Sequence, residues 1–140
     1  MAAADFYYAI NATFRYMHRH YGQEGLYAYW RSLGQEYFSD VIEQFRAGGL
    51  GAVEEYWRGF FTVEPGDLVS VERTDSAVVI EVQECPAIKH LQAGGREVME
   101  LYCQHCQVIN TEMAKGAGLE FDMSGGQGSC RQTFVEKEQD

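Results

Sequence analysis

The sequence predicts an α+β fold in which N-terminal helices and a central cysteine-bearing helix pack on an antiparallel sheet of two hairpins. Two observations predict it. Apolar residues recur every three or four positions through the first 62 residues, which is the helical period, and two pairs of later segments show a period of two. The length of 140 residues suits one domain, 1–140, with a helical half (1–62) and a ββαββ half (63–137).

The helical half is expected to contain three helices. Apolar positions in residues 5–21 predict an amphipathic helix that ends near Gly22. A second, longer helix is predicted over residues 26–45. Three glycines between positions 48 and 51 interrupt the pattern, and residues 52–61 predict a short third helix.

The first hairpin follows a predicted turn at Pro65-Gly66. Residues 68–73 and the valine-rich residues 77–84 alternate apolar and polar side chains around a Thr74-Asp75 turn. This alternation predicts two half-buried strands, with one face of the second turned toward the core.

The second hairpin is separated from the first by the most regular helical pattern in the chain. Residues 96–115 predict a helix with one narrow polar strip, so that most of its surface faces protein. Residues 119–123 and 130–135 then predict two strands joined by a glycine-rich turn at 124–129. A charged tail, 136–140, follows.

The charge of the chain excludes one class of partner. Twenty-one acidic and eleven basic side chains give a formal net charge of −10, which repels a phosphate backbone, so we expect no nucleic-acid binding. No stretch reaches the roughly 20 apolar residues that cross a bilayer, and residues 1–5 lack a basic start. We therefore expect no membrane partner and a cytoplasmic location.

Four cysteines in the second half are the main candidates for a chemical centre. Cys85 ends a predicted strand, Cys103 and Cys106 lie three residues apart on the predicted helix, and Cys130 begins the last strand. If these elements converge, four thiolates could bind zinc at about 2.3 Å or hold an iron–sulfur cluster. The alternative is that they are buried, reduced cysteines with one functional thiol, because cysteine is often buried.

Two further residues on the same helix could take part in catalysis. His105 lies in an apolar stripe, so its nitrogens must be satisfied in the core or lie beside a cavity. As a general base it would activate Cys103 or Cys106, and Asn110 would donate a hydrogen bond to developing charge. The candidate catalytic set is therefore Cys103, His105, Cys106 and Asn110.

Residues Glu84 to Phe134 resemble the L-2-amino-thiazoline-4-carboxylic acid hydrolase-like family, which is related in element order to 4-vinyl reductase domains. The resemblance is carried by four short motifs: Glu84-Cys85-Pro86, Leu101-Tyr102-Cys103, Gly118-Leu119-Glu120-Phe121 and Gly128-Ser129-Cys130. It implies a small α+β domain with a cavity bounded by the cysteine-bearing elements. It also implies hydrolysis of a C–N or C–S bond in a small heterocycle.

Three cysteines, Cys85, Cys103 and Cys130, match the cysteine positions of that family. The sequence differs at Gln104-His105-Cys106, where hydrolase-like members are expected to have an acidic residue after the helix cysteine. Imidazole and thiol in place of a carboxylate favour zinc, iron or copper(I) over magnesium or manganese.

Three functions are compatible with these features. The first is a hydrolase with a Cys/His centre. The second is a cysteine-rich module that binds a small molecule, a metal or an iron–sulfur cluster and acts with a partner protein. The third is an interaction subunit whose aromatic N-terminal helices, residues 5–61, form a homodimer or dock on a partner enzyme.

Overall fold

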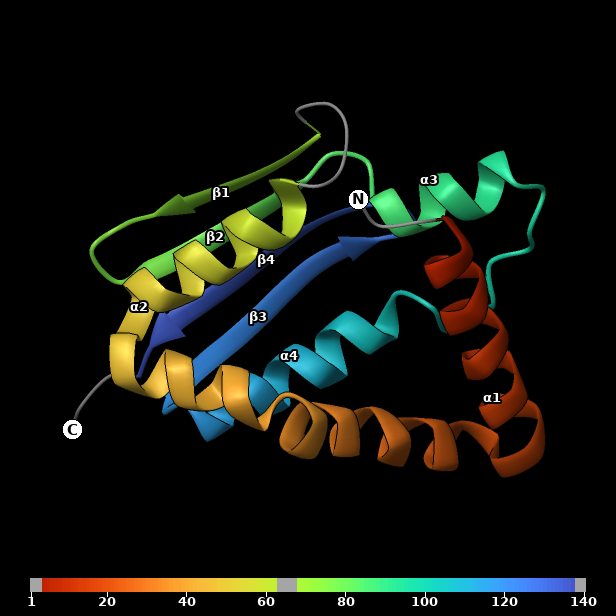
Figure 1. Cartoon of the computed structure of the whole chain (residues 1–140), viewed down its shortest axis with the longest axis horizontal. Helices are drawn as coiled ribbons and strands as arrows, with labels where there is room; N and C mark the ends of the chain where they lie inside the picture. The colour runs from red at the N-terminus through yellow and green to blue at the C-terminus, as the bar shows by residue number, and fades with distance from the viewer. Residues whose placement is uncertain (1–3, 63–67, 138–140) are drawn as a thin grey trace.

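The computed structural model describes residues 4–62 and 68–137, and these residues have the predicted α+β fold. The turn predicted at Pro65-Gly66 lies outside them. The described elements are α1 (Ala4–Ser32), the π-helix η1 (Leu33–Tyr37), α2 (Ser39–Thr62), β1 (Val69–Arg73), β2 (Ala77–Val82), α3 (Pro86–Ala93), α4 (Gln104–Gly116), β3 (Leu119–Gly126) and β4 (Ser129–Glu136) (Figure 1). None of these helices is long and apolar enough to cross a membrane.

Both predicted hairpins are confirmed. β1 pairs with β2 and β3 pairs with β4, and an antiparallel β2–β4 pairing from Ala77–Val135 to Val82–Cys130 joins them in the order β1-β2-β4-β3. Alternation along β2 buries Val78, Ile80 and Val82, as the period of two predicts. The sheet therefore has one covered face.

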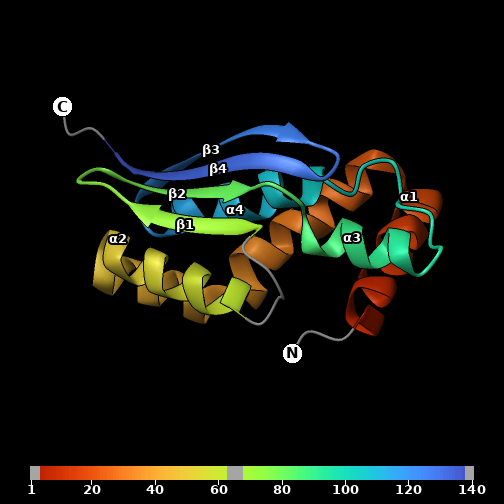
Figure 2. The ribbon, with the colours of Figure 1, turned by 90° about the horizontal axis from the view of Figure 1, so that it is seen from above.

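α2 and α4 cover the same face of this sheet (Figure 2). Phe45 of α2 contacts Phe134 of β4, and Asn110 of α4 is bonded to Gln132 two residues earlier on that strand. Residues two apart on a strand share a face, so both helices lie over one side. The largest fully buried side chains are Trp30, Phe45, Phe134, Leu26, Ile80, Leu91, Met113, Val53 and Val78.

The predicted breaks in the helical half are kinks. Gly22 has φ 72° and ψ −177° inside α1, and Gly49 has φ 62° and ψ −149° inside α2. A positive φ is the conformation that glycine adopts at little cost, so the chain changes direction there and resumes a helix. Figure 1 shows α1 bent into two arms, with α4 in the angle between them and α3 at the start of the N-terminal arm.

The helix predicted over residues 26–45 is interrupted by η1, which corrects that prediction. Gly34 of η1 is buried against α4, where a Cβ at this position would lie 2.8 Å from the Glu112 Cβ and 2.9 Å from the Ile109 carbonyl oxygen. Gln35 Nε2 also donates to Glu112 Oε2 at 3.0 Å. The wide π-turn thus accompanies a close backbone approach, which apolar periodicity does not encode.

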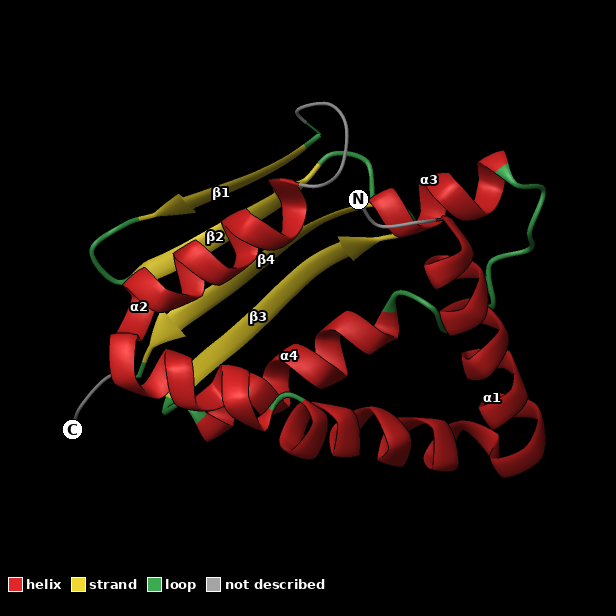
Figure 3. Cartoon of the chain, in the orientation of Figure 1, coloured by secondary structure: helices red, strands yellow, loops and turns green. Residues whose placement is uncertain are grey.

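The helix predicted over residues 96–115 begins only at Gln104, so its first eight residues are a second correction. Asn11 of α1 explains the change, because its Nδ2 donates to the Glu97 carbonyl at 2.8 Å and its Oδ1 accepts the Met99 N–H at 3.0 Å. These backbone groups are hydrogen-bonded to a side chain distant in sequence and not to other backbone groups of a helix. Figure 3 shows the resulting loop between α3 and α4 running beside α1.

Candidate functional site

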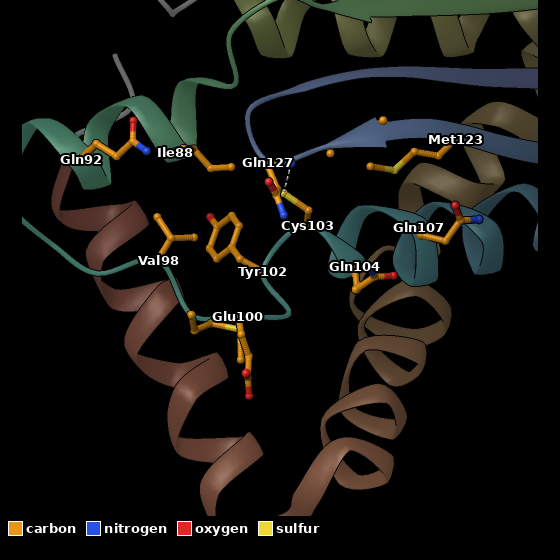
Figure 4. Close-up of a pocket in the computed structure, with 13 residues that line it drawn as sticks. Ile88, Gln92, Val98, Glu100, Tyr102, Cys103, Gln104, Gln107, Met123 and Gln127 are labelled. Carbon is orange, nitrogen blue, oxygen red and sulfur yellow. Dashed lines mark hydrogen bonds between the residues drawn. The ribbon is translucent and has the colours of Figure 1, made fainter.

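An open pocket of about 710 Å³ lies where α3, the loop before α4, the start of α4 and the β3–β4 turn meet (Figure 4). Its volume is within the range of about 300–1,000 Å³ that is usual for small-molecule sites. It is lined by Ile88, Gln92, Val98, Met99, Glu100, Tyr102, Cys103, Gln104, Gln107, Met123, Gly125, Gly126 and Gln127. This set contains four glutamine amides, one carboxylate, one thiol and no basic side chain.

Cys103 is the cysteine in this lining, and it occupies the cap position before α4. Its sulfur accepts a hydrogen bond from the backbone N–H of Gln127 at 3.2 Å, drawn as the dashed line in Figure 4. Gln127 has φ 56° and stands between Gly126 and Gly128, whose φ values are 153° and 111°. The glycine-rich turn therefore does more than join two strands, because its backbone bends an N–H toward the thiol.

His105 lies away from Cys103, among aromatic rings. Its ring centroid is 5.2 Å from that of Phe14 and 4.8 Å from that of Tyr102. Nδ1 is bonded to the Tyr102 carbonyl oxygen, so Nδ1 carries the proton and Nε2 is the acceptor. Burial lowers the pKa of His105, since the apolar surroundings disfavour imidazolium.

Cys106 is the thiol that contacts this imidazole, with Sγ 3.6 Å from His105 Nε2. Burial raises the pKa of Cys106 to about 11, and a hydrogen bond with Gln132 offsets part of that increase. Both shifts favour neutral forms, so the pair is a thiol that donates to an imidazole and not a thiolate–imidazolium pair.

Asn110 lies in the core and is not among the pocket-lining residues. Its Nδ2 donates to Gln132 Oε1 at 2.9 Å, and Gln132 Nε2 donates to Cys130 Sγ at 3.4 Å. Asn110 is 4% exposed and Gln132 is 6% exposed. In this arrangement Asn110 links α4 to β4 and does not face a ligand.

The remaining two cysteines flank the glycine-rich turn. Cys85 precedes α3, and its N–H donates to the Gly128 carbonyl at 2.7 Å, whereas Cys130 lies opposite Gly125 in the β3–β4 ladder. Burial raises the pKa of Cys85 to about 11, against a smaller lowering by the Ile88 and Ala87 amides and a further rise from Cys106 and Cys103. Burial likewise raises the pKa of Cys130.

The four thiols therefore lie around one turn. Cys106 and Cys130 are both hydrogen-bonded to the Gln132 amide, and Cys103 accepts the Gln127 N–H. Within residues 4–62 and 68–137, no group of three or more His, Cys, Asp or Glu side chains is arranged to hold a metal ion. Zinc or iron–sulfur binding by Cys85, Cys103, Cys106 and Cys130 stays a prediction.

Sequence reasoning missed three polar residues of this region. Gln104 lies within Cys103-Gln104-His105-Cys106 and Gln107 follows three residues later, a spacing that places both amides in the predicted polar strip of the helix but does not reveal the pocket. Gln132 gave no such signal, because alternation along β4 marks a buried position but not the partner that satisfies its amide.

Comparisons with models of protein families, with curated proteins and with solved structures give no match to this chain.

Proposed function

We propose that the chain binds a small, uncharged polar molecule in the pocket at Cys103. The observation that carries this proposal is the convergence of four amides, Gln92, Gln104, Gln107 and Gln127, on a cavity that also contains a thiol. An amide donates and accepts hydrogen bonds, which suits ligands with C=O and N–H groups side by side. Small cyclic amides and nitrogen heterocycles have this pattern.

The apolar part of the lining supports a flat ligand. Tyr102 offers an aromatic ring, and the flexible thioethers of Met99 and Met123 can adapt to a ring face. Gly125 and Gly126 of the lining present backbone without side chains, which permits close approach of a ligand.

The charge of the site argues against an anionic ligand. Glu100 is the ionisable carboxylate in the lining, no lysine or arginine accompanies it, and the whole chain carries a net charge of −10. An anion would meet a repulsive field without a positive partner.

Ligand-observed NMR with a panel of uracil, nicotinamide and hydantoin tests the proposal, with benzoate as the anionic comparison. We expect at least one cyclic amide to bind and benzoate not to bind. Gln107→Leu should weaken binding by about fivefold, since one hydrogen bond contributes about 1 kcal/mol. Gln44→Leu, an exposed change on α2, is the matched control. Binding of benzoate alone, or equal loss in both variants, would reject the proposal.

The hydrolase suggested by the family resemblance is the second candidate. It is favoured by the Gln127 N–H on Cys103 Sγ, because a donor at sulfur stabilises the thiolate that a nucleophile requires. His105 contacts Cys106, which fits the alternative in which it activates that thiol, and a reaction at Cys103 would need another base.

Turnover of 2-amino-thiazoline-4-carboxylate, followed by its absorbance, tests the hydrolase. Cys103→Ala should abolish turnover, and Cys130→Ala should preserve it. Turnover that survives in Cys103→Ala would refute a nucleophilic role for this thiol. Elemental analysis and an absorption spectrum of anaerobically purified protein test the metal prediction in the same sample, since zinc or a charge-transfer band would each indicate thiolate ligands.

The partner prediction also remains a proposal. The large exposed hydrophobic side chains are Phe6, Tyr16, Tyr21, Tyr37 and Phe60, all on the N-terminal helices. Exposed aromatic residues are common in protein interfaces. Light scattering of the chain, with Tyr37→Ser as the variant, tests homodimerisation, and the cytoplasmic location is retained as an expectation.

A further inference from the structure

Cys103 and Cys106 form a C-x-x-C pair at the start of α4. Cys103 is the cap residue, with φ −67° and ψ −17°, and Cys106 lies in the first turn. Residues three apart on a helix have Cβ atoms about 5–6 Å apart and lie on neighbouring positions of one side. A disulfide needs Cβ atoms about 3.5–4.5 Å apart, so a small adjustment of the cap residue suffices to join them.

Both thiols are partly exposed, but they face different surroundings. Cys103 lines the open pocket, while Cys106 is not part of the lining and contacts His105 behind it. A dithiol exchanges with an external disulfide when one sulfur can be approached and the second waits within reach. The helix places these two thiols in those two positions.

We propose that Cys103 and Cys106 are a reversible dithiol–disulfide couple that exchanges with small disulfides entering the pocket. This inference rests on the two sulfurs and the access to one of them, so it stands independently of which neutral ligand the pocket binds.

The exchange balances in two steps. Cys103, as thiolate, attacks one sulfur of a disulfide R–S–S–R′, forming a mixed disulfide with R–S and releasing R′–S⁻, which takes up the proton that Cys103 lost. Cys106 then attacks the Cys103 sulfur, forming the internal disulfide and releasing R–S⁻, which takes up the Cys106 proton. The small disulfide is reduced to two thiols and the protein dithiol is oxidised by two electrons.

Two neighbouring groups assist these steps. The Gln127 N–H bonds Cys103 Sγ and stabilises negative charge on it when it attacks and when it leaves. His105 Nε2, 3.6 Å from Cys106 Sγ, is the acceptor for the Cys106 proton in the second step, while its Nδ1 stays bonded to Tyr102. His105 is thus the proton acceptor for Cys106 and not for Cys103.

The uncharged pair bis(2-hydroxyethyl) disulfide and 2-mercaptoethanol, at a series of ratios, are the probes. After acid quenching, alkylation of the remaining thiols and mass spectrometry should show two thiols lost together in the wild type, and digestion without reductant should locate the bond between Cys103 and Cys106. Cys85→Ser and Cys130→Ser are the controls and should behave as the wild type.

The single variants separate the roles of the two sulfurs. Cys106→Ser should accumulate 2-mercaptoethanol on Cys103, because the resolving thiol is missing, and Cys103→Ser should lose modification at Cys106 in the folded protein. Circular dichroism checks that each variant is folded. A disulfide to Cys85 or Cys130, an absence of oxidation at every ratio, or Cys106 modified before Cys103 would overturn the proposal.

Discussion

The segment from Tyr102 to Asn110 has two faces with different chemistry. The pocket face, Cys103, Gln104 and Gln107, points to an open cavity, and its thiol accepts a backbone N–H. The core face, His105, Cys106, Ile109 and Asn110, packs on aromatic rings and on β4. Each face contains a cysteine, and on the core face burial favours the neutral forms of Cys106 and His105. Position on the helix, and not residue type, therefore decides what each thiol can do.

The largest expected effect comes from removing the Asn11 side chain, which is hydrogen-bonded to the loop before α4 and so helps to position both faces. Asn11→Ala should lower the free energy of unfolding by about 1–3 kcal/mol, because the buried Met99 N–H loses its partner and the Glu97 carbonyl keeps Arg15 but loses the Asn11 amide. Urea denaturation measures it. Asn11→Asp keeps the acceptor for Met99 and should lose less. A change in Asn11→Ala below about 0.5 kcal/mol, the level of a surface substitution, would contradict this account.

The second effect is confined to the core face. Gln132→Met should cost about 1–3 kcal/mol, because it leaves the buried Asn110 amide without its acceptor. Adding Asn110→Leu should cost less than the two single changes together, since no orphaned amide remains. A double-mutant cycle by urea denaturation measures the coupling, and strict additivity would show that the two side chains do not stabilise each other.

The third effect is a pH dependence that belongs to the core face. Because the pKa of His105 is lowered in the fold, the unfolded chain binds the proton more readily, and stability should fall as the pH drops below about 6.5, the ordinary histidine value. The Cys106 pKa is raised to about 11, so stability should also fall as the pH rises above 9.0, the ordinary value of a cysteine thiol.

The melting temperature, measured over a series of pH values, checks both. His105→Gln should reduce its fall at acid pH, and Cys106→Ala should reduce its fall at alkaline pH. The exposed His20 gives the control, since His20→Gln leaves the core face unchanged. Part of the alkaline dependence should persist in Cys106→Ala, because burial also raises the pKa of Cys85 and of Cys130. No reduction in either variant would contradict the assignment to His105 and Cys106.

The smallest effect is expected on the pocket face. Cys103→Ser should change the free energy of unfolding by less than about 0.5 kcal/mol, because its side chain borders an open pocket. The same substitution should remove the thiol that reacts first with a maleimide in the folded protein, which mass spectrometry follows over time. A large loss of stability would place Cys103 with the core face instead.

The sequence alone determined the fold class, both hairpins, which residues of β2 form its buried face, and the helix breaks at Gly22 and Gly49. Apolar periodicity, turn residues and the conformational freedom of glycine act over a few neighbouring residues, so these features can be predicted locally. The placement of the four cysteines on elements that could converge was predicted in the same way.

Only the tertiary structure decided where α4 begins, where η1 interrupts the helical half and which cysteine faces the pocket. Each depends on contacts between residues far apart in sequence: Asn11 with Met99, Gly34 with Ile109, and Gln127 with Cys103. A polar side chain that satisfies distant backbone groups overrides local helical preference, because a buried unpaired N–H or C=O is costly. The partner is fixed by folding, and no pattern within a single segment encodes it.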